Sequence, residues 1–270
     1  MARSGDPHAL GQLLRSRRER LVPADVGLPA GTRRRARGLR REEVALLANL
    51  SPTYYTFLEQ GRPVHPSDQV LDALASALRM TVAEHRYLRV LANGPADQDG
   101  IAAGTPAPPE ELAPGVADLV RRLDPSPTYV KGRRWDVLVA NQAARELFTD
   151  WEALPPGQRN LVHWMFTAPR AREVYLDWEA EARAMLGRFR LAAARHPADP
   201  DFEALISALH RDSDRVREWW PDHDVRPVGG AGTKRLRHPR LGPLEYSHVV
   251  LQVADRPDQT MVTHTAVSPG

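Results

Sequence analysis

The side chains best suited to catalysis in this sequence are histidines, serines and an aspartate in its C-terminal half. His223 and Asp224 are adjacent, and His238, Ser213 and Ser247 lie near them in the sequence. Serine, histidine and a carboxylate can act as nucleophile, base and orienting group. No nucleophile-elbow motif accompanies them, however, and adjacent histidine and aspartate side chains do not easily point to one place. We therefore expect no enzymatic activity and assign no catalytic residue.

Metal and cofactor chemistry has equally little support. His163, His210, His223 and His248 are scattered, without the close pairing that metal-ligand motifs show. The absence of cysteine excludes disulfides, thiolate zinc sites and cysteine nucleophiles. No P-loop or dinucleotide-binding glycine motif is present. The sequence predicts no metal and no cofactor, and we interpret these histidines as surface or core residues.

Arginine supplies most of the positive charge, and it is concentrated near the N-terminus. Residues 1–92 contain 15 arginines and nine acidic residues, whereas residues 93–270 contain 22 basic and 25 acidic residues. A basic first domain followed by a mildly acidic second is typical of a DNA-binding module joined to a sensor, because neutralised phosphates supply much of DNA affinity. Ordinary variation of surface charge is the alternative.

Four of these arginines stand among five consecutive residues. Arg33, Arg34, Arg35 and Arg37 lie in a Pro- and Gly-rich segment, residues 22–38, that is longer than a link between two helices requires. Their mutual repulsion would be relieved beside phosphates or in a narrow minor groove. A solvated run of charges is the alternative interpretation.

Residues 41–61 predict two short helices around a tight turn. Val44, Leu47 and Ala48 have helical spacing, Asn49 interrupts the pattern, and a second run ends at Gly61. Ser51 is a good N-cap, and Pro52 suits the first helical position. This is the plan of a helix-turn-helix, whose second helix enters the DNA major groove. An ordinary helical hairpin remains the alternative.

The second of these helices has an inner and an outer side. Tyr55 and Leu58 should pack inward. The outer side should carry Thr53, Tyr54, Thr56 and Phe57, where Phe57 can meet a thymine methyl group and the threonines can bond base edges or phosphates. Arg41, before the turn, would reach a phosphate or a guanine. The predicted DNA-binding residues are Arg33, Arg34, Arg35, Arg37, Arg40, Arg41, Ser51, Thr53, Tyr54, Thr56 and Phe57.

The periodicity predicts a mainly α chain with a second, α+β domain. Further helices are expected over residues 9–21, 67–80 and from Thr81 onward, which gives five helices in a domain of residues 1–92. Residues 93–114 read as a Pro- and Gly-rich linker. In residues 115–270 the pattern predicts about five strands: two within 128–141, then 232–238, 244–253 and 259–266. Helices over 141–148, 171–195, 201–210 and 214–220 are inserted after the second strand.

The second domain is rich in aromatic residues with some basic ones near its strands. Trp135, Phe166, Tyr175 and Trp178 belong to the aromatic set. The basic set is Arg133, Arg134, Lys234, Arg235 and His238. A cavity lined by aromatic rings with a basic mouth would suit an apolar, fatty-acid-like carboxylate. Core packing is the alternative interpretation for each aromatic residue.

The N-terminal sequence resembles the Xre, or lambda-repressor-like, helix-turn-helix family. Arg41-Glu42-Glu43-Val44-Ala45 and Leu58-Glu59-Gln60-Gly61 match its pattern, and Gly38-Leu39-Arg40 before them is similar to members with an MmyB-like ligand-binding domain. Two positions depart from the pattern. Asn49 replaces the usual glycine of the turn, which is tolerable because asparagine enters the left-handed region readily. Phe57 stands where arginine is common, so the preferred DNA sequence should differ.

The C-terminal sequence resembles the PAS-like, MmyB-like ligand-binding domain. Separated segments match it in order, among them Arg134-Trp135-Asp136-Val137, Ala140-Asn141, Met165-Phe166, Asp177-Trp178 and Arg235-Leu236-Arg237-His238-Pro239. Residues 212–216 depart from the family pattern. The resemblance implies a fatty-acid-like ligand and an antiparallel sheet with inserted helices. The ligand-binding candidates are Trp135, Asn141, Phe166, Tyr175, Trp178, Arg235 and His238.

Together these features predict a cytoplasmic bacterial transcriptional regulator. It would bind an inverted-repeat operator in double-stranded DNA as a homodimer, because two recognition helices related by a two-fold axis read half-sites about one helical turn apart. A small apolar ligand would bias that binding. No run of eighteen apolar residues is present, so no membrane association is expected. A second domain that binds another protein is the main alternative, and an enzyme fused to a DNA-binding module is a third.

Overall fold

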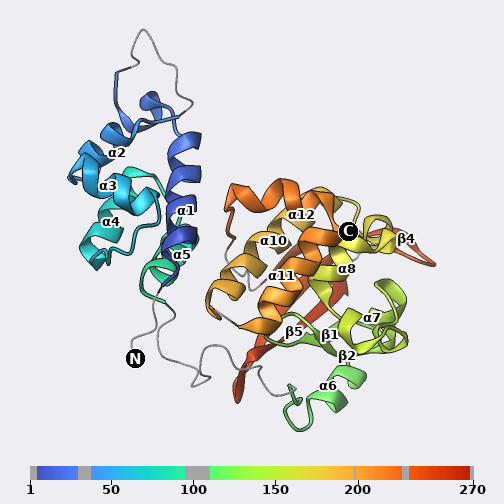
Figure 1. The fold of residues 1–270 in the computed structure, drawn as a ribbon. Coiled ribbons are helices and arrows are strands. Elements are labelled where there is room, and N and C mark those ends of the chain that lie inside the picture. Colours follow the sequence, from blue (N-terminus) through green and yellow to red (C-terminus); the bar gives the residue numbers. More distant parts are fainter. Residues whose placement is uncertain (1–4, 30–37, 95–109, 198, 227–230, 268–270) are drawn as a thin grey trace. The chain divides into compact units, whose positions relative to one another are not determined.

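The computed structural model describes residues 5–29, 38–94, 110–197, 199–226 and 231–267 (Figure 1). The chain divides into two compact units. The first comprises Met1–Ala103 with Ala193–Ala198 and Arg217–Arg226, and the second comprises Gly104–Ala192, Asp199–Val216 and Pro227–Gly270. Most of the expected linker lies outside the described residues, so the limits 1–92, 93–114 and 115–270 remain a prediction. Each unit is described by itself.

The N-terminal part of the first unit contains the expected five helices within its described residues. They are α1 (Pro7–Arg20), α2 (Arg41–Leu47), α3 (Pro52–Glu59), α4 (Asp68–Ala77) and α5 (Val82–Asn93). Side-chain caps begin four of them, as the sequence predicts for Ser51 and Thr81. Leucines from several helices form the core together with Tyr55. The residues exposed by no more than 1% include Leu13, Leu14, Tyr55, Leu58, Leu71, Leu74 and Leu88.

The second unit is built on a five-stranded antiparallel sheet, which confirms the α+β prediction. Its strands are β1 (Thr128–Lys131), β2 (Val137–Ala140), β3 (Ala231–His238), β4 (Gly242–Val253) and β5 (Arg256–Ala266). Their order across the sheet is β2-β1-β5-β4-β3. The strand β5, last in sequence, therefore lies at the centre, beside the first strand.

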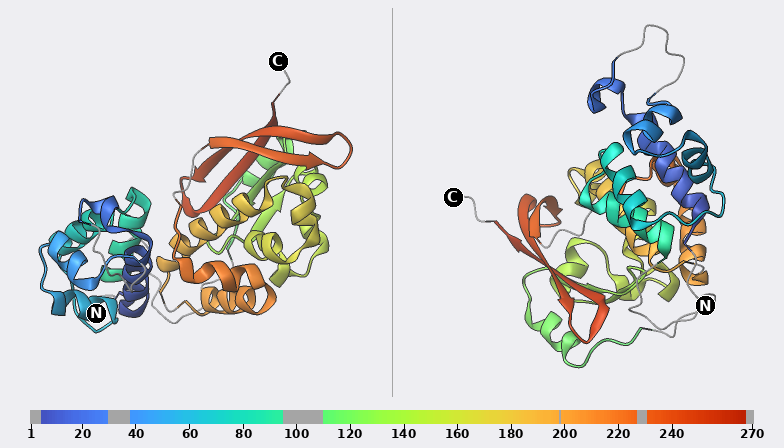
Figure 2. Two further views of the ribbon diagram at one scale, coloured as in Figure 1. Left: turned by 90° about the horizontal axis from the view of Figure 1, so that it is seen from above. Right: turned by 90° about the vertical axis from the view of Figure 1, so that its left-hand side faces the viewer.

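Helices of the second unit follow β2 in sequence, except for α6 (Val116–Arg122), which precedes the sheet. The others are α7 (Gln142–Leu147), α8 (Leu161–Thr167), α9 (Pro169–Val174), α10 (Trp178–Ala194), α11 (Pro200–Asp212) and α12 (Asp214–Trp219), the last of which continues into the first unit. Most of these helices gather on one side of the sheet (Figure 2).

The helical region expected over residues 171–195 consists of two helices, because the chain leaves the helical conformation between α9 and α10. Tyr175 forms a β-bridge with Leu236 of the edge strand β3, and the Leu176 amide donates to the Arg235 carbonyl at 3.1 Å. Apolar residues at helical spacing continue through this break. The periodicity therefore gives no sign of the backbone pairing with a distant strand.

The two faces of strand β1 have different surroundings. Val130 packs with Val120 of α6 and Met261 of β5 on one face. Tyr129, its neighbour in sequence, instead contacts Phe148, at 5.9 Å between ring centroids, and His264. Because side chains alternate along a strand, Tyr129 and Lys131 share the face opposite Val130.

Candidate DNA-binding and ligand-binding sites

The turn between α2 and α3 has the conformation that its sequence predicts. Asn49 takes a left-handed φ of 53°, and Gly61 ends the second helix with a φ of 69°. The Ser51 hydroxyl accepts the Tyr54 amide at 3.1 Å, and Pro52 is the first helical residue. The local chemistry of four residues thus fixes where α3 begins and ends.

The inner and outer sides of α3 are also as predicted. Tyr55 and Leu58 are buried in the core, whereas Thr53 is exposed. Tyr54, Thr56 and Phe57 are partly exposed. An accessible row of two hydroxyl-bearing threonines and two aromatic rings on a firmly packed helix is suited to contact with a DNA groove.

Two of these outer residues have intramolecular partners that the sequence does not reveal. The Thr56 hydroxyl donates to the Pro52 carbonyl at 2.8 Å, so its oxygen faces a ligand chiefly as an acceptor. The Arg62 guanidinium carbon lies 4.2 Å from the centroid of the Phe57 ring. This cation–π contact covers part of the ring and explains how Phe57 is tolerated near water.

A buried carboxylate behind α3 joins the first three helices. Glu59, with 1% of its side chain exposed, receives Arg18 Nε at 2.7 Å and Arg18 Nη2 at 2.9 Å. Arg41 Nε and Nη2 lie 2.9 and 2.8 Å from Glu59 Oε1. Burial opposes ionisation of Glu59, yet the hydrogen bonds from both arginines outweigh it and hold its pKa below the usual value. The carboxylate is therefore charged and paired at neutral pH.

Arg41 consequently has a structural role beside the predicted DNA contact. Its side chain is 44% exposed and is held at the start of α2 by Glu59. Arg40 is exposed, and its backbone amide donates to Glu43 Oε2 at 2.7 Å. The other predicted phosphate-binding arginines, Arg33, Arg34, Arg35 and Arg37, lie outside the described residues.

The four aromatic ligand-binding candidates are all buried in the second unit. Trp135, Phe166, Tyr175 and Trp178 are each less than 9% exposed. Phe166 packs edge-on against Trp178, at 6.2 Å between centroids, and Trp178 Nε1 donates to the Met165 carbonyl at 3.1 Å. These rings belong to the interior on the helical side of the sheet, where an apolar ligand would have to bind.

The three polar ligand-binding candidates each have a structural partner. Asn141 is 1% exposed, and its side chain bonds Thr128, Ala144 and Ser126. Arg235 is exposed and lies 3.3 Å from Asp177. His238 Nδ1 accepts two backbone amides of the following turn at 3.2 Å each. None of these contacts joins the three residues to the aromatic set.

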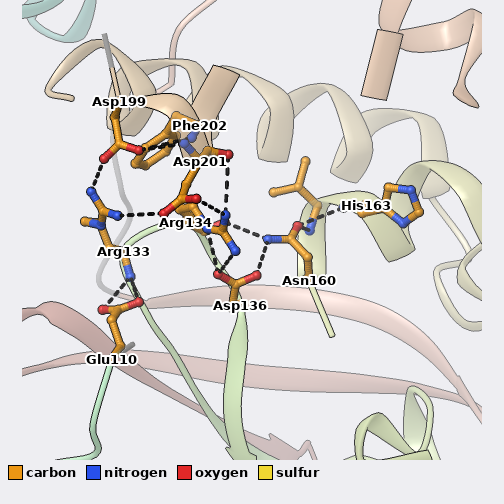
Figure 3. Close-up of polar contacts among 10 residues, drawn as sticks. Glu110, Arg133, Arg134, Asp136, Asn160, His163, Asp199, Asp201 and Phe202 are labelled. Atoms are coloured by element: carbon orange, nitrogen blue, oxygen red, sulfur yellow. Dashed lines mark hydrogen bonds and ion pairs between the residues drawn. The ribbon is translucent and has the colours of Figure 1, made fainter. Parts of the chain in front are cut away.

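The expected basic mouth is not formed by Arg133 and Arg134, because carboxylates neutralise both (Figure 3). Arg133 is buried and pairs with Asp199, the N-cap of α11, while its backbone amide donates to both oxygens of Glu110 at 2.9 and 3.0 Å. Arg134 lies 2.9 Å from Asp136. The sequence shows that Arg133 and Arg134 are adjacent basic residues. It does not show that Arg133 pairs with Asp199, because these two residues are far apart in the sequence.

Asn160 completes this network at the start of α8 (Figure 3). Its Nδ2 donates to the Arg134 carbonyl at 2.8 Å and to Asp136 Oδ1 at 3.0 Å. Its Oδ1 accepts the amides of Val162 and His163, each at 3.0 Å. The network fixes the β1–β2 turn against the beginnings of α8 and α11, and we interpret it as structural.

Sequence reasoning misses Lys131 and His264, which lie on the inner face of the sheet, the face toward the helical layer, as does Lys234 of the expected basic set. Lys131 Nζ lies 3.9 Å from the centroid of the Trp135 ring, and Lys234 is paired with Glu181 of α10. His264 is 1% exposed, and burial lowers its pKa to about 3. Strand alternation from Tyr129 is the signal that could have placed Lys131 on this face, although the glycine after it favours a turn.

The residues considered for catalysis and metal binding are not assembled into a site in the described part of the chain. The Ser213 hydroxyl accepts the Val216 amide at 3.3 Å, and His238 is bound to a turn. Among the described residues, no group of three or more histidines and carboxylates is arranged to hold a metal ion. No helix within the described ranges is both long and apolar enough to span a membrane.

Comparison with protein families identifies both parts of the chain. A model described as "Helix-turn-helix domain" matches residues 9–88, and one described as "MmyB-like transcription regulator ligand binding domain" matches residues 112–269. The comparison with curated proteins found no match. The two domains are those of a DNA-binding transcription regulator with a ligand-sensing domain. Since the second match covers more than half of the 270 residues, the chain belongs to the family of MmyB-like transcription regulators.

Proposed function

We propose that the protein binds an inverted-repeat operator as a homodimer and that an apolar, fatty-acid-like molecule in the second domain controls this binding. The observation that carries the DNA part is the outer side of α3, where Thr53 is exposed and its neighbours are partly exposed. The inner side of the same helix is fixed in the core by Tyr55 and Leu58. A rigid helix with an accessible polar side is what major-groove readout requires.

The ligand part of the proposal is supported by the buried aromatic residues of the second unit. Trp135, Tyr175 and Trp178 offer apolar surface beside the sheet, and apolar pockets with few polar groups are the usual sites for small molecules. The protein would act in the cytoplasm, where its DNA target is located, and would catalyse no reaction. Ligand binding would shift the placement of the two recognition helices of the homodimer relative to each other. It can change DNA affinity only if the ligand binds one placement more tightly than the other.

Selection of binding sites from random duplex DNA with the full-length protein tests the DNA part. We expect enrichment of an inverted repeat with half-site centres about 10 base pairs apart, and two protomers per site in analytical ultracentrifugation. No enrichment would contradict sequence-specific binding. A single protomer on a non-repeated site would contradict the homodimer.

Native mass spectrometry and organic extraction of the purified protein test the ligand part. We expect a bound small molecule, or a higher melting temperature when medium-chain fatty acids are added, because a ligand that binds the folded state stabilises it. If neither is observed and a stoichiometric protein partner co-purifies, the second domain is instead a protein-interaction module.

A further inference from the structure

Lys131 stands out in the second unit because its ammonium group lies on the inner face of the sheet. It follows Tyr129 by two positions on β1, whereas Val130 between them packs toward α6. Its Nζ lies 3.9 Å from the centroid of the Trp135 ring, and that ring packs edge-on against Phe189 of α10, at 6.1 Å between centroids. The side chain is thus directed toward the helical layer and keeps part of its surface accessible.

The charge of Lys131 has no counter-ion among the described residues. Apart from the Trp135 ring, no hydrogen bond or ion pair reaches its Nζ within those residues. The pKa of Lys131 is lowered to about 7, chiefly by burial and also by repulsion from Arg188 of α10, while attraction from Glu110 opposes this shift. Lys234, on the same side of the sheet, differs because Glu181 pairs with it.

Two other side chains on this face, Tyr129 and His248, have a polar group without a hydrogen-bond partner in the described part of the chain. Tyr129 is buried, and no described residue hydrogen-bonds to its hydroxyl. His248 Nδ1 is buried without a partner, and its ring stacks on His264, whose ring also stacks on Tyr129. A buried polar group without a partner costs about 1–3 kcal/mol, so the His248 Nδ1 atom, together with the unpaired Lys131 ammonium and the Tyr129 hydroxyl, favours a site that a ligand completes.

We propose that Lys131 supplies the counter-charge for a single acid group on an otherwise apolar ligand of the second domain. This inference rests on the proposed ligand-binding function and deepens it, because it assigns the anion-binding residue and the charge of the ligand. The neighbouring Trp135 ring would contact the first carbons of the chain, while the carboxylate meets the ammonium and comes within reach of the Tyr129 hydroxyl. Arg235 and His238 would have no part in it.

Pairing of Lys131 with a bound carboxylate should change the protonation state of its side chain. With a pKa near 7, most Lys131 side chains are neutral at pH 8 in the free protein, while a bound carboxylate favours the ammonium form. Binding of an acid at pH 8 should therefore take up close to one proton per protein molecule. Binding of a neutral ligand should take up none.

Titration calorimetry of the full-length protein with decanoate and with decanol tests this assignment. We expect the wild type to bind decanoate at least tenfold more tightly than decanol, and Lys131→Met to lose that preference through weaker decanoate binding. Arg256→Met, which removes an exposed cation from strand β5 of the same sheet, is the matched control and should behave as wild type. Measurements at pH 8 in two buffers of different ionisation enthalpy give the proton uptake.

Each alternative outcome contradicts a particular claim. If the wild type binds both probes equally, takes up no proton with decanoate, or keeps its preference in Lys131→Met, the role of Lys131 is wrong while the apolar ligand stands. If the wild type binds neither probe, the apolar-ligand proposal itself is wrong, and the role of Lys131 falls with it. The proton uptake of the wild type tests the role of Lys131 even if a variant fails to fold.

Discussion

At the scale of single residues, Glu59 determines much of the geometry of the DNA-binding unit. Its carboxylate on α3 pairs with Arg18 of α1 and Arg41 of α2. Arg18 Nη1 also donates to the Leu39 carbonyl at 2.9 Å, just before α2 begins. One buried side chain therefore fixes the positions of three helices relative to one another.

Replacing Glu59 by glutamine should lower the free energy of unfolding by about 3 kcal/mol, because the largely buried Arg18 guanidinium then keeps only the more distant Glu19 carboxylate, at 3.5 Å, as a counter-charge. Urea denaturation followed by circular dichroism measures the change. The exposed Glu42→Gln on α2 is the control and should change stability by less than about 0.5 kcal/mol. Equal stabilities of the two variants would show that the network is not stabilising.

The contribution of Glu59 to the free energy of unfolding should depend on pH, because its pKa is shifted. Its folded-state pKa lies below the unfolded value, so its contribution is complete above the unfolded pKa and is lost as the pH falls through the folded one. The difference in unfolding free energy between wild type and Glu59→Gln should therefore shrink on acidification.

Unlike Glu59, Lys131 should destabilise the folded protein at neutral pH. Its pKa is about 7 in the folded state, whereas an unfolded lysine titrates near 10.4, so the unfolded state binds more protons between these values. The contribution of Lys131 to stability should rise as the pH is raised from 7 to 10. Lys131→Met should have a higher melting temperature than wild type at pH 7, and the gap should narrow toward pH 10. A gap that stays constant would contradict the shifted pKa.

Single residues also show what sequence patterns can and cannot predict. The left-handed Asn49, the Ser51 cap and the buried Tyr55 and Leu58 follow from local chemistry, and the structure confirms them. Arg133 pairs with Asp199, which is far away in the sequence, so the prediction that Arg133 belongs to a basic mouth is wrong. The position of Lys131 on the inner face is not evident from the sequence, because a lysine beside a glycine is typical of a turn.

At the scale of elements, helix ends and strands are predicted well where capping residues and alternation mark them. The five N-terminal helices and five strands are found close to their expected positions. The break between α9 and α10 is not predictable, because it arises from pairing of Tyr175 with β3 rather than from a proline or glycine. Long-range backbone pairing thus overrides the local pattern at this point.

Asn141 illustrates how one side chain couples two elements. Its Oδ1 accepts the Thr128 amide of β1 at 2.9 Å and the Ala144 amide of α7 at 3.0 Å, and its Nδ2 donates to the Ser126 carbonyl at 2.8 Å. Asn141→Ala should lower the unfolding free energy by about 2–3 kcal/mol, because a buried cap and two further hydrogen bonds are lost. The affinity of the folded protein for decanoate should be unchanged.

Thermal denaturation and calorimetry of Asn141→Ala separate these two effects. The exposed Gln142→Ala is the control, since it alters the first residue of the same helix without removing the cap. A stable Asn141→Ala variant that no longer binds decanoate would instead support the prediction that Asn141 is a ligand-binding residue.

At the scale of the whole molecule, a DNA-binding domain and a ligand-binding domain share one chain. Charge asymmetry and family resemblance are sufficient to predict this combination. The identity of the ligand and the operator depends on the fit of particular side chains, which composition and spacing do not specify. Linkage requires that, if the ligand changes operator affinity, the operator changes ligand affinity by the same factor.

Arg41 is a poor probe of the DNA interface, because its removal also breaks the contact with Glu59. Thr53 is better suited, since it is exposed on the outer side of α3 and is not part of the Glu59 network. Its replacement by alanine should leave the fold intact. The exposed Gln69 on α4 offers a matched alanine control outside the recognition helix.

Fluorescence anisotropy of a selected operator with wild type, Thr53→Ala and Gln69→Ala is the most direct test that the outer side of α3 reads DNA. We predict that Thr53→Ala weakens operator binding by about 1–3 kcal/mol and leaves binding to unrelated DNA unchanged, while Gln69→Ala matches wild type. Wild-type operator affinity in Thr53→Ala would contradict this role of α3.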